Sequence, residues 1–172
     1  MEFKLTAHTS GKEVFKLVQE YLEKMKLKIS FRDDKRPWGG FLGIEESDVK
    51  DFTRIFFPGT EFPGLEQGKK LSPKILLVEP GKRLSWQYHK RRAEVWKVLQ
   101  GPVEIVTSDS DNQSAGKLFN EGDIIQIARE QRHRLKGLTT WGIIAEIWQH
   151  TDKAHPSDED DIVRVDDDFG RE

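Results

Sequence analysis

Four residues of this chain have side chains that bind divalent metal ions in many proteins. Gln87 and His89 are two residues apart, and Glu94 follows after a short basic stretch. His133 lies further along the chain, in the stretch RHRLKG. One amide oxygen, one carboxylate and two imidazoles suit zinc, manganese, iron or cobalt, and they leave coordination positions open, as catalytic sites require. We therefore expect one divalent ion, with zinc as the first choice.

Strand geometry would bring these side chains together. Residues two apart in a β-strand point to the same face, so Gln87 and His89 can both face the interior of a barrel. Glu94 begins the next strand-like run, which we expect to be the antiparallel partner of the first. A single strand histidine is more often a hydrogen-bonded core or surface residue than a ligand, so the prediction depends on the joint spacing.

The elements that would carry these residues are predominantly β. After Leu71, short strand-like runs recur at the spacing typical of a sandwich or barrel, separated by turn-forming residues. The predicted strands span 75–78, 84–89, 94–99, 103–107, 117–119, 123–127 and 142–148. The sequence therefore predicts a mainly β domain in this half of the chain.

The N-terminal part has a different pattern. Apolar residues recur every three or four positions, which predicts an amphipathic helix from about Gly11 to Lys26, capped by Thr9 or Ser10. Ile29 and Phe31 then alternate with polar neighbours, as in a short strand. Residues 36–40 should interrupt regular structure. We expect residues 1–35 to pack on a barrel formed by residues 36–172.

Residues 43–70 are rich in Gly, Pro and Phe, and we expect them to form a long loop inserted in the barrel domain, with buried aromatic anchors. Such a loop is either a lid or binding loop, or a packed surface insertion without a role in chemistry. Residues 157–172 are acidic, and by composition alone they would form a disordered tail.

Composition narrows the classes of function. Lys+Arg 28 and Asp+Glu 30 nearly balance, which removes the electrostatic basis for bulk nucleic-acid binding. The chain has no cysteine, so thiolate ligands and a cysteine nucleophile are excluded. No apolar run approaches the roughly 20 residues needed to cross a bilayer. We expect a cytoplasmic protein without membrane or nucleic-acid partners, for which apolar faces of the sheets and helix would permit a homodimer.

The spacing of Gly81, Gln87, His89, Glu94 and Gly101 resembles the first motif of the cupins, with glutamine where many members carry the first histidine. The second cupin motif is similar to Gly122, Ala128 and His133-Arg134-Leu135, with alanine where proline is usual. This resemblance implies a cupin fold, a double-stranded β-helix or jelly-roll barrel, here with an N-terminal α-helix.

The chain further resembles the type II mannose-6-phosphate isomerases, including the isomerase half of bifunctional mannose-1-phosphate guanylyltransferases. The resemblance covers residues 36–171 except 43–70, and it makes the acidic C-terminal stretch an ordered family element. The matching positions are Arg36-Pro37-Trp38-Gly39, Lys74, Pro80-Gly81, Leu84-Ser85, Gln87, His89, Arg92-Ala93-Glu94, Trp96, His133-Arg134-Leu135, residues 159–164 and Asp168-Phe169-Gly170-Arg171.

The resemblance implies a metal-dependent isomerase of a small phosphosugar, with mannose 6-phosphate and fructose 6-phosphate as the first choice. Gln87, His89, Glu94 and His133 would hold the metal. Since a ligating Glu94 cannot also be the free base, we assign that role to Glu146, for which a surface ion pair is the alternative. Four cationic residues are candidates for the phosphate: Arg36, Lys74, Arg92 and Arg164.

Five positions depart from the family pattern, namely Lys90, Arg91, Val95, Lys97 and Gly137. They keep open an isomerase for another sugar, or a cupin that binds a sugar or sugar phosphate without catalysis. A further hypothesis, which does not depend on these positions, is an iron-dependent oxygenase, because two histidines and one carboxylate also suit ferrous iron.

Overall fold

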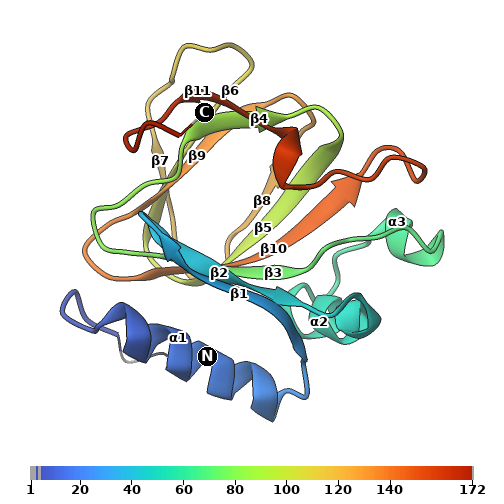
Figure 1. The fold of residues 1–172 in the computed structure, drawn as a ribbon, viewed down its shortest axis with the longest axis horizontal. Helices are drawn as coiled ribbons and strands as arrows, with labels where there is room; N and C mark the ends of the chain where they lie inside the picture. The colour runs from blue at the N-terminus through green and yellow to red at the C-terminus, as the bar shows by residue number, and fades with distance from the viewer. Residues whose placement is uncertain (1–2, 4, 172) are drawn as a thin grey trace.

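The computed structural model describes residues 3 and 5–171 and consists of two antiparallel sheets that face each other (Figure 1). The outermost positions of the predicted domain ranges, residues 1, 2 and 172, lie outside the described residues. In the larger sheet the order is β1 (Ile29–Arg36), β2 (Gly39–Ile44), β3 (Lys74–Val78), β10 (Gly142–His150), β5 (Arg92–Gln100) and β8 (Ile124–Ile127).

The smaller sheet carries the remaining strands. Its order is β11 (Ile162–Asp166), β4 (Trp86–His89), β9 (Arg132–Gly137), β6 (Val103–Ser108) and β7 (Lys117–Phe119). The helices and short turns are α1 (Gly11–Lys24), η1 (Glu46–Asp48), α2 (Val49–Phe56), α3 (Pro63–Glu66) and η2 (Glu159–Asp161). The prediction of a mainly β domain with an N-terminal helix is therefore confirmed. Within the described ranges, no helix is long and apolar enough to span a bilayer.

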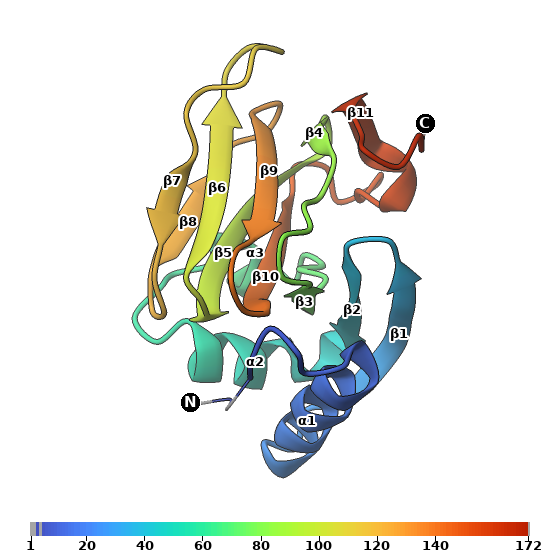
Figure 2. The same ribbon diagram turned by 90° about the vertical axis from the view of Figure 1, so that its left-hand side faces the viewer.

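The larger sheet is buried on both faces, which explains why its central strands are apolar without alternation. Its inner face contributes Leu76, Trp96 and Ile144 to the core between the sheets. Its outer face contributes Leu77 and Ile147, among others, to a second core beneath the helices. Figure 2 shows α1 and α2 lying against this side of the barrel. The N-terminal helix thus extends the barrel core.

Helix α1 begins as predicted and uses its apolar stripe within the chain. The Ser10 side chain accepts a hydrogen bond from the backbone N–H of Glu13 and caps the helix. Val14, Val18 and Leu22 are buried in the second core. Because the chain's own sheet covers this stripe, α1 gives no support to the homodimer expectation.

The prediction of a long loop at 43–70 is wrong for its first half. Val49, Phe52, Thr53 and Phe56 repeat at helical spacing, and they form the buried face of α2. The Gly and Pro residues that follow concealed this short periodic run. The predicted aromatic anchors are present, since Phe57 and Phe62 are also buried.

Only Pro37 and Trp38 form the turn between β1 and β2, so the interruption predicted for residues 36–40 is too long. Gly39 has φ +130°, and a Cβ at this residue would lie 2.1 Å from the Leu77 carbonyl oxygen. Glycine is therefore needed because β3 passes close to the backbone. The acidic C-terminal stretch is ordered as η2 and β11, as the family resemblance implies.

Candidate metal centre

Three of the predicted ligands meet between the two sheets. His89 ends β4 and His133 lies on the neighbouring β9, where Gln87 pairs directly with His133. Glu94 reaches the same place from β5 in the opposite sheet, where it pairs with Ile127 and Trp148. The prediction that the Glu94 strand pairs with the Gln87–His89 strand is wrong. The chain instead crosses from one sheet to the other at residues 90–91.

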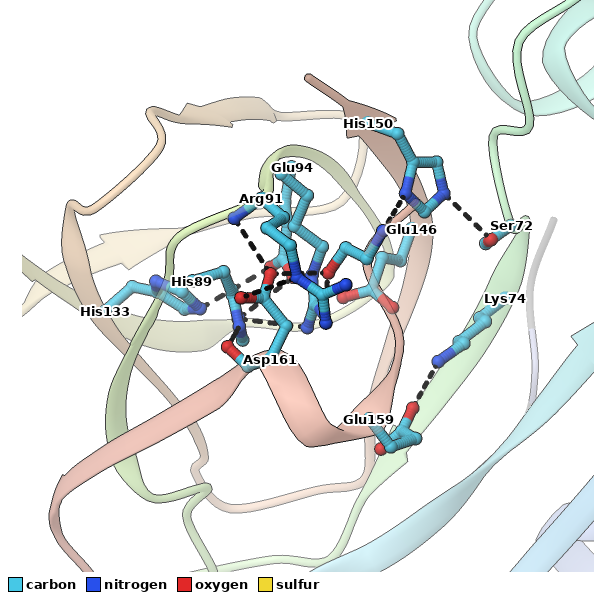
Figure 3. A network of polar contacts seen from close by, with 12 residues as sticks. Ser72, Lys74, His89, Arg91, Glu94, His133, Glu146, His150, Glu159 and Asp161 are labelled. Carbon is cyan, nitrogen blue, oxygen red and sulfur yellow. Dashed lines mark hydrogen bonds and ion pairs between the residues drawn. The ribbon is translucent and has the colours of Figure 1, made fainter. Parts of the chain in front are cut away.

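The ligand atoms of His89, Glu94 and His133 all lie within 4.8 Å of one another. His89 Nε2 is 3.2 Å from Glu94 Oε1, and His133 Nε2 is 3.5 Å from Glu94 Oε2. The three side chains are at most 2% exposed. They converge from three strands in Figure 3. Two imidazoles and one carboxylate in this arrangement can share one divalent ion.

Backbone carbonyls hold the two imidazoles in orientations that suit metal binding. His89 Nδ1 lies 3.3 Å from the Asp161 carbonyl, and His133 Nδ1 lies 2.9 Å from the Gln131 carbonyl. A carbonyl oxygen can only accept, so each Nδ1 carries the proton and each Nε2 keeps its lone pair within the cluster. Metal-ligating histidines usually have a partner of this kind at the second nitrogen.

Two buried atoms of the cluster lack a hydrogen-bond partner in the described part of the chain. They are Glu94 Oε2 and His133 Nε2. Leaving a buried acceptor unsatisfied costs about 1–3 kcal/mol, more if it is charged, so such atoms call for an explanation. A cation shared by both atoms would satisfy them, and the residues present therefore fit a divalent metal.

The protonation states also suit a metal. Burial lowers the pKa of His133 to about 4, so its imidazole is neutral at pH 7. Burial alone would raise the pKa of Glu94, but its interactions with His89 and with the Arg92 guanidinium hold this pKa well below its usual value. A neutral imidazole and an ionised carboxylate are the forms that bind metal ions.

Gln87, the fourth predicted ligand, is also buried and points to the same interior. Its Oε1 accepts a hydrogen bond of 2.5 Å from the Ser85 hydroxyl. A carbonyl-type oxygen has two lone pairs, so this bond leaves one for another partner. The structure places Gln87 beside the cluster, and its role as a ligand stays a prediction.

Arg92 lies within the cluster, on its pocket side. Its Nε donates to Glu94 Oε1 at 2.8 Å, and its NH2 group donates to His89 Nε2 at 3.1 Å. Its NH1 group donates to Ser157 Oγ at 2.8 Å and to the Asp158 carbonyl at 3.0 Å. Four of its five N–H groups therefore have protein partners. One N–H group remains for the predicted contact with a phosphate.

A narrow cleft, partly open to solvent, leads from Glu94 to the surface. Every predicted site residue except the two histidines lines it. Those lining residues are Arg36, Lys74, Gln87, Arg92, Glu94, Glu146 and Arg164. Aromatic rings complete the wall, with Trp38, Trp96 and Trp148 among them.

The pocket residues follow the strand order of the larger sheet. Lys74 on β3 pairs with Glu146 on β10, which in turn pairs with Trp96 on β5, two residues from Glu94. Neighbouring strands lie about 4.8 Å apart, so the backbones of β3 and β5 are about 10 Å apart. The pocket thus has a candidate metal-binding end at β5 and a cationic end at β3.

Glu146 lies between these two ends, lines the pocket and is 5% exposed. The indole N–H of Trp96 donates to its Oε1 at 3.0 Å. Burial, and then the negative charge of Glu94, raise the pKa of Glu146 to about 8. This carboxyl group can therefore exchange a proton near neutral pH, as a general acid or base must.

The sequence interpretation missed several residues around the cluster, all from the acidic C-terminal stretch. Asp161 accepts hydrogen bonds from the backbone N–H groups of Lys90 and Arg91, at 3.2 and 2.9 Å. Ser157 joins Asp161 to Arg92, donating to Asp161 Oδ2 at 2.6 Å. Glu159 bonds Lys74 at the cationic end of the pocket. Only the family resemblance marked residues 159–164, because their composition resembles a solvated tail.

A family model described as the mannose-6-phosphate isomerase C-terminal domain matches residues 44–167. Alginate biosynthesis protein AlgA of Pseudomonas aeruginosa is 29% identical over 129 residues, covering 73% of this chain and 24% of that protein. A mannose-1-phosphate guanylyltransferase of Escherichia coli strain K12 is 32% identical over 117 residues, covering 68% of this chain and 23% of that protein. The chain spans about a quarter of the length of these relatives.

Solved structures with a similar fold share little sequence. A mutant of oxalate decarboxylase OxdC from Bacillus subtilis superposes with a TM-score of 0.56 at 14% identity, over 78% of this chain and 30% of that chain. The capsular polysaccharide assembling protein CapF of Staphylococcus aureus superposes with a TM-score of 0.53 at 12% identity, over 81% of this chain and 34% of that chain. These likenesses concern the fold alone, and they confirm the predicted cupin barrel.

Proposed function

Because this chain belongs to the family of mannose-6-phosphate isomerase C-terminal domains, we propose that it is a metal-dependent isomerase of a phosphosugar. Mannose 6-phosphate and fructose 6-phosphate are the first choice of substrate pair. The observation that carries the proposal is the buried His89, Glu94 and His133 cluster, which opens into a pocket with a cationic end. A phosphosugar has the matching parts, namely oxygen atoms for a metal and a phosphate for cations.

Aldose–ketose interconversion moves one hydrogen between C1 and C2, and negative charge develops on O1 and O2. A divalent ion, zinc in the first place, held by His89, Glu94, His133 and Gln87, would supply several kcal/mol of stabilisation to that charge. Glu146 is the proposed base and acid. From aldose to ketose, its carboxylate takes the proton from C2 and returns it to C1, while the hydroxyl proton of O2 passes to O1, so no proton or electron is gained or lost overall.

The cationic end of the pocket would bind the phosphate. Lys74 and Arg36 lie there, and Arg164 lines the same cavity. Arg92 is proposed to act closer to the metal, because its guanidinium already contacts Glu94 and His89. Trp148 lies beneath Arg92, with 3.5 Å between the guanidinium carbon and the ring centre, and this stacking fixes the plane of the guanidinium.

None of the five residues that depart from the family pattern lines the pocket. Lys90 is exposed, and Arg91 pairs with Asp158 at 2.8 Å. Val95 packs into the core beneath the helices. These departures therefore do not favour a cupin without catalysis over an isomerase.

The decisive test is metal analysis combined with a screen of phosphosugar isomerisation by the metal-loaded protein. We expect one bound divalent ion per chain and interconversion of at least one aldose and ketose phosphate pair. His133→Ala should lose both metal and turnover. His155→Ala is the matched control, since His155 is an exposed histidine that pairs with Asp152.

Two results would contradict the proposal in different ways. Tight metal binding by His133→Ala would refute the ligand assignment. Metal binding without turnover of any phosphosugar would refute the isomerase and leave a sugar-phosphate-binding cupin. Oxygen consumption by the protein loaded with ferrous iron would instead support the hypothesis of an iron-dependent oxygenase.

A further inference from the structure

The cationic end of the pocket already holds an anion that belongs to the protein. Glu159 Oε1 lies 2.7 Å from Lys74 Nζ, and Glu159 Oε2 lies 3.8 Å from Arg36 NH2. Figure 3 shows Glu159 reaching Lys74 from the C-terminal segment. The two cations come from β1 and β3, whereas the carboxylate comes from η2, about 85 residues further along the chain than Lys74.

Other contacts hold both cations in place independently of Glu159. The Lys74 ammonium lies 3.6 Å from the centre of the Trp148 ring and 4.8 Å from that of Phe41, and its side chain is 13% exposed. Arg36 is bound by Asp33 at 2.7 Å. Removing the Glu159 carboxylate would therefore leave the two positive charges facing the pocket, ready for another anion.

Glu159 itself is less firmly held. Its side chain is 46% exposed, and it is the first residue of a single 3-10 turn. The backbone of this turn is anchored by buried Asp161, two residues later. Rotation of the side chain alone can thus withdraw the carboxylate, while η2 stays in place.

The electrostatics of this position select an anion. Burial alone would raise the pKa of Glu159, but the charge of Lys74 and the hydrogen bond from it lower that pKa below its usual value. A phosphate monoester carries up to two negative charges and three acceptor oxygens, and it is the stronger ligand for an ammonium and a guanidinium. A neutral hydroxyl group lacks this negative charge, so it cannot displace the carboxylate from Lys74 and Arg36.

We propose that Glu159 is a specificity residue that competes for the phosphate subsite formed by Lys74 and Arg36. A phosphate dianion binds there by displacing the carboxylate, whereas an unphosphorylated sugar leaves Glu159 in place. This inference rests on the proposed function in one respect, that the ligand of the pocket is a sugar phosphate. It adds that the phosphate must lie about 10 Å, two strand spacings, from the Glu94 strand.

That spacing restricts the ligand class. The reacting carbons must be near the metal cluster at β5, and the phosphate must reach Lys74 at β3. A sugar phosphorylated at the far end of a five- or six-carbon chain satisfies both, because it is long enough to pass Glu146 on the intervening β10. A sugar 1-phosphate does not, since its phosphate is next to the reacting carbons.

The test is the binding of inorganic phosphate to the full-length, metal-loaded protein, measured by isothermal titration calorimetry. Glu159→Gln keeps the shape of the side chain and removes the competing charge, so we expect phosphate to bind about fivefold more tightly. Asp160→Asn is the matched control, because Asp160 is the exposed neighbour of Glu159 and its loss changes net charge equally. This control should bind phosphate as the unaltered protein does. Lys74→Gln should lose phosphate binding.

The outcomes separate this inference from the proposed function. If Glu159→Gln binds phosphate no more tightly than Asp160→Asn, Glu159 is not a competitor, even where the protein isomerises a phosphosugar. If Glu159→Gln gains affinity but no phosphosugar is converted, the competitor stands and the isomerase fails. Glu159→Gln could also bind unphosphorylated mannose or fructose more tightly than the unaltered protein does. An affinity gain equal to the gain for phosphate would refute the role of Glu159 in specificity.

Discussion

The properties of the metal cluster depend on where two protons lie. The carbonyls of Asp161 and Gln131 bind the Nδ1 protons of His89 and His133, so both Nε2 atoms keep their lone pairs within the cluster. Spacing in the sequence predicted that these side chains would meet. It could not predict their tautomers, because the two carbonyls come from a distant segment and from a turn whose conformation the residue types do not determine.

Glu146 gives a prediction about how the stability of the folded protein depends on pH. Its folded-state pKa of about 8 is above the ordinary 4.5, so the folded protein retains a proton that the unfolded chain releases between these values. Stability must then fall as pH rises through this window, by up to about 1.4 kcal/mol per pH unit. In metal-free protein, Glu146→Gln should remove this contribution. Urea unfolding of both proteins at pH 5 and pH 8 measures it, and identical pH slopes would contradict it.

At the scale of elements, the C-terminal segment organises the strand crossing between two of the ligands. Buried Asp161 binds the backbone N–H groups of Lys90 and Arg91, which connect His89 to Glu94. The same residue supplies the carbonyl that orients His89. The segment formed by η2 and β11 is therefore a part of the site, although its composition resembles a disordered tail.

Asp161→Ala should weaken metal binding by about 10- to 100-fold, because a loosened crossing no longer fixes His89 and Glu94 relative to each other. Competition with a fluorescent chelator measures this affinity. Asp160→Ala is the matched control, since Asp160 is exposed and adjacent. Equal metal affinities in the two variants would show that the segment does not position the ligands.

Helix α2 supplies a second prediction about elements, this time for stability. Phe52 is 0% exposed and contacts Phe56 and Phe57 in the core outside the barrel. Phe52→Ala should reduce the free energy of unfolding by about 3–5 kcal/mol, measured by urea denaturation. Phe31→Ala is the control, because Phe31 is 57% exposed. A change below 1 kcal/mol at Phe52 would mean that α2 is not part of the cooperative core.

Predictability from sequence varied among the elements for physical reasons. Strands with long apolar runs, such as β3 and β10, were predicted within two residues because both of their faces are buried. Strand β9 was missed, since four of its six residues are charged or histidine and the strand reads as a surface turn. Helix α2 was missed because its two turns precede a run of Pro and Gly. In each of these elements, burial against the rest of the fold determines the secondary structure.

For the whole molecule, the metal should act as a ligand of the folded state. The cluster joins β4, β5 and β9, which belong to both sheets, and an unfolded chain cannot bring these strands together. A metal present at a hundredfold excess over its dissociation constant stabilises the folded state by about 2.7 kcal/mol.

Chelation should therefore lower the melting temperature, and added zinc or manganese should restore it. Differential scanning fluorimetry with and without EDTA measures the shift. His133→Ala should melt at the same temperature in both conditions, whereas His155→Ala should respond as the unaltered protein does. A melting temperature that is insensitive to EDTA in metal-loaded protein would contradict a site that bridges the two sheets.

The position of Asp161 in the chain also has a consequence for biosynthesis. A ribosome releases His89, Glu94 and His133 before it releases the residue whose carbonyl orients His89. During that interval the nascent chain exposes three ligands without their final geometry, and domains generally begin to fold in this N-terminal to C-terminal order. We therefore expect the candidate metal site to reach its final geometry late, when the C-terminal segment docks, and an ion captured earlier to be held by a looser site.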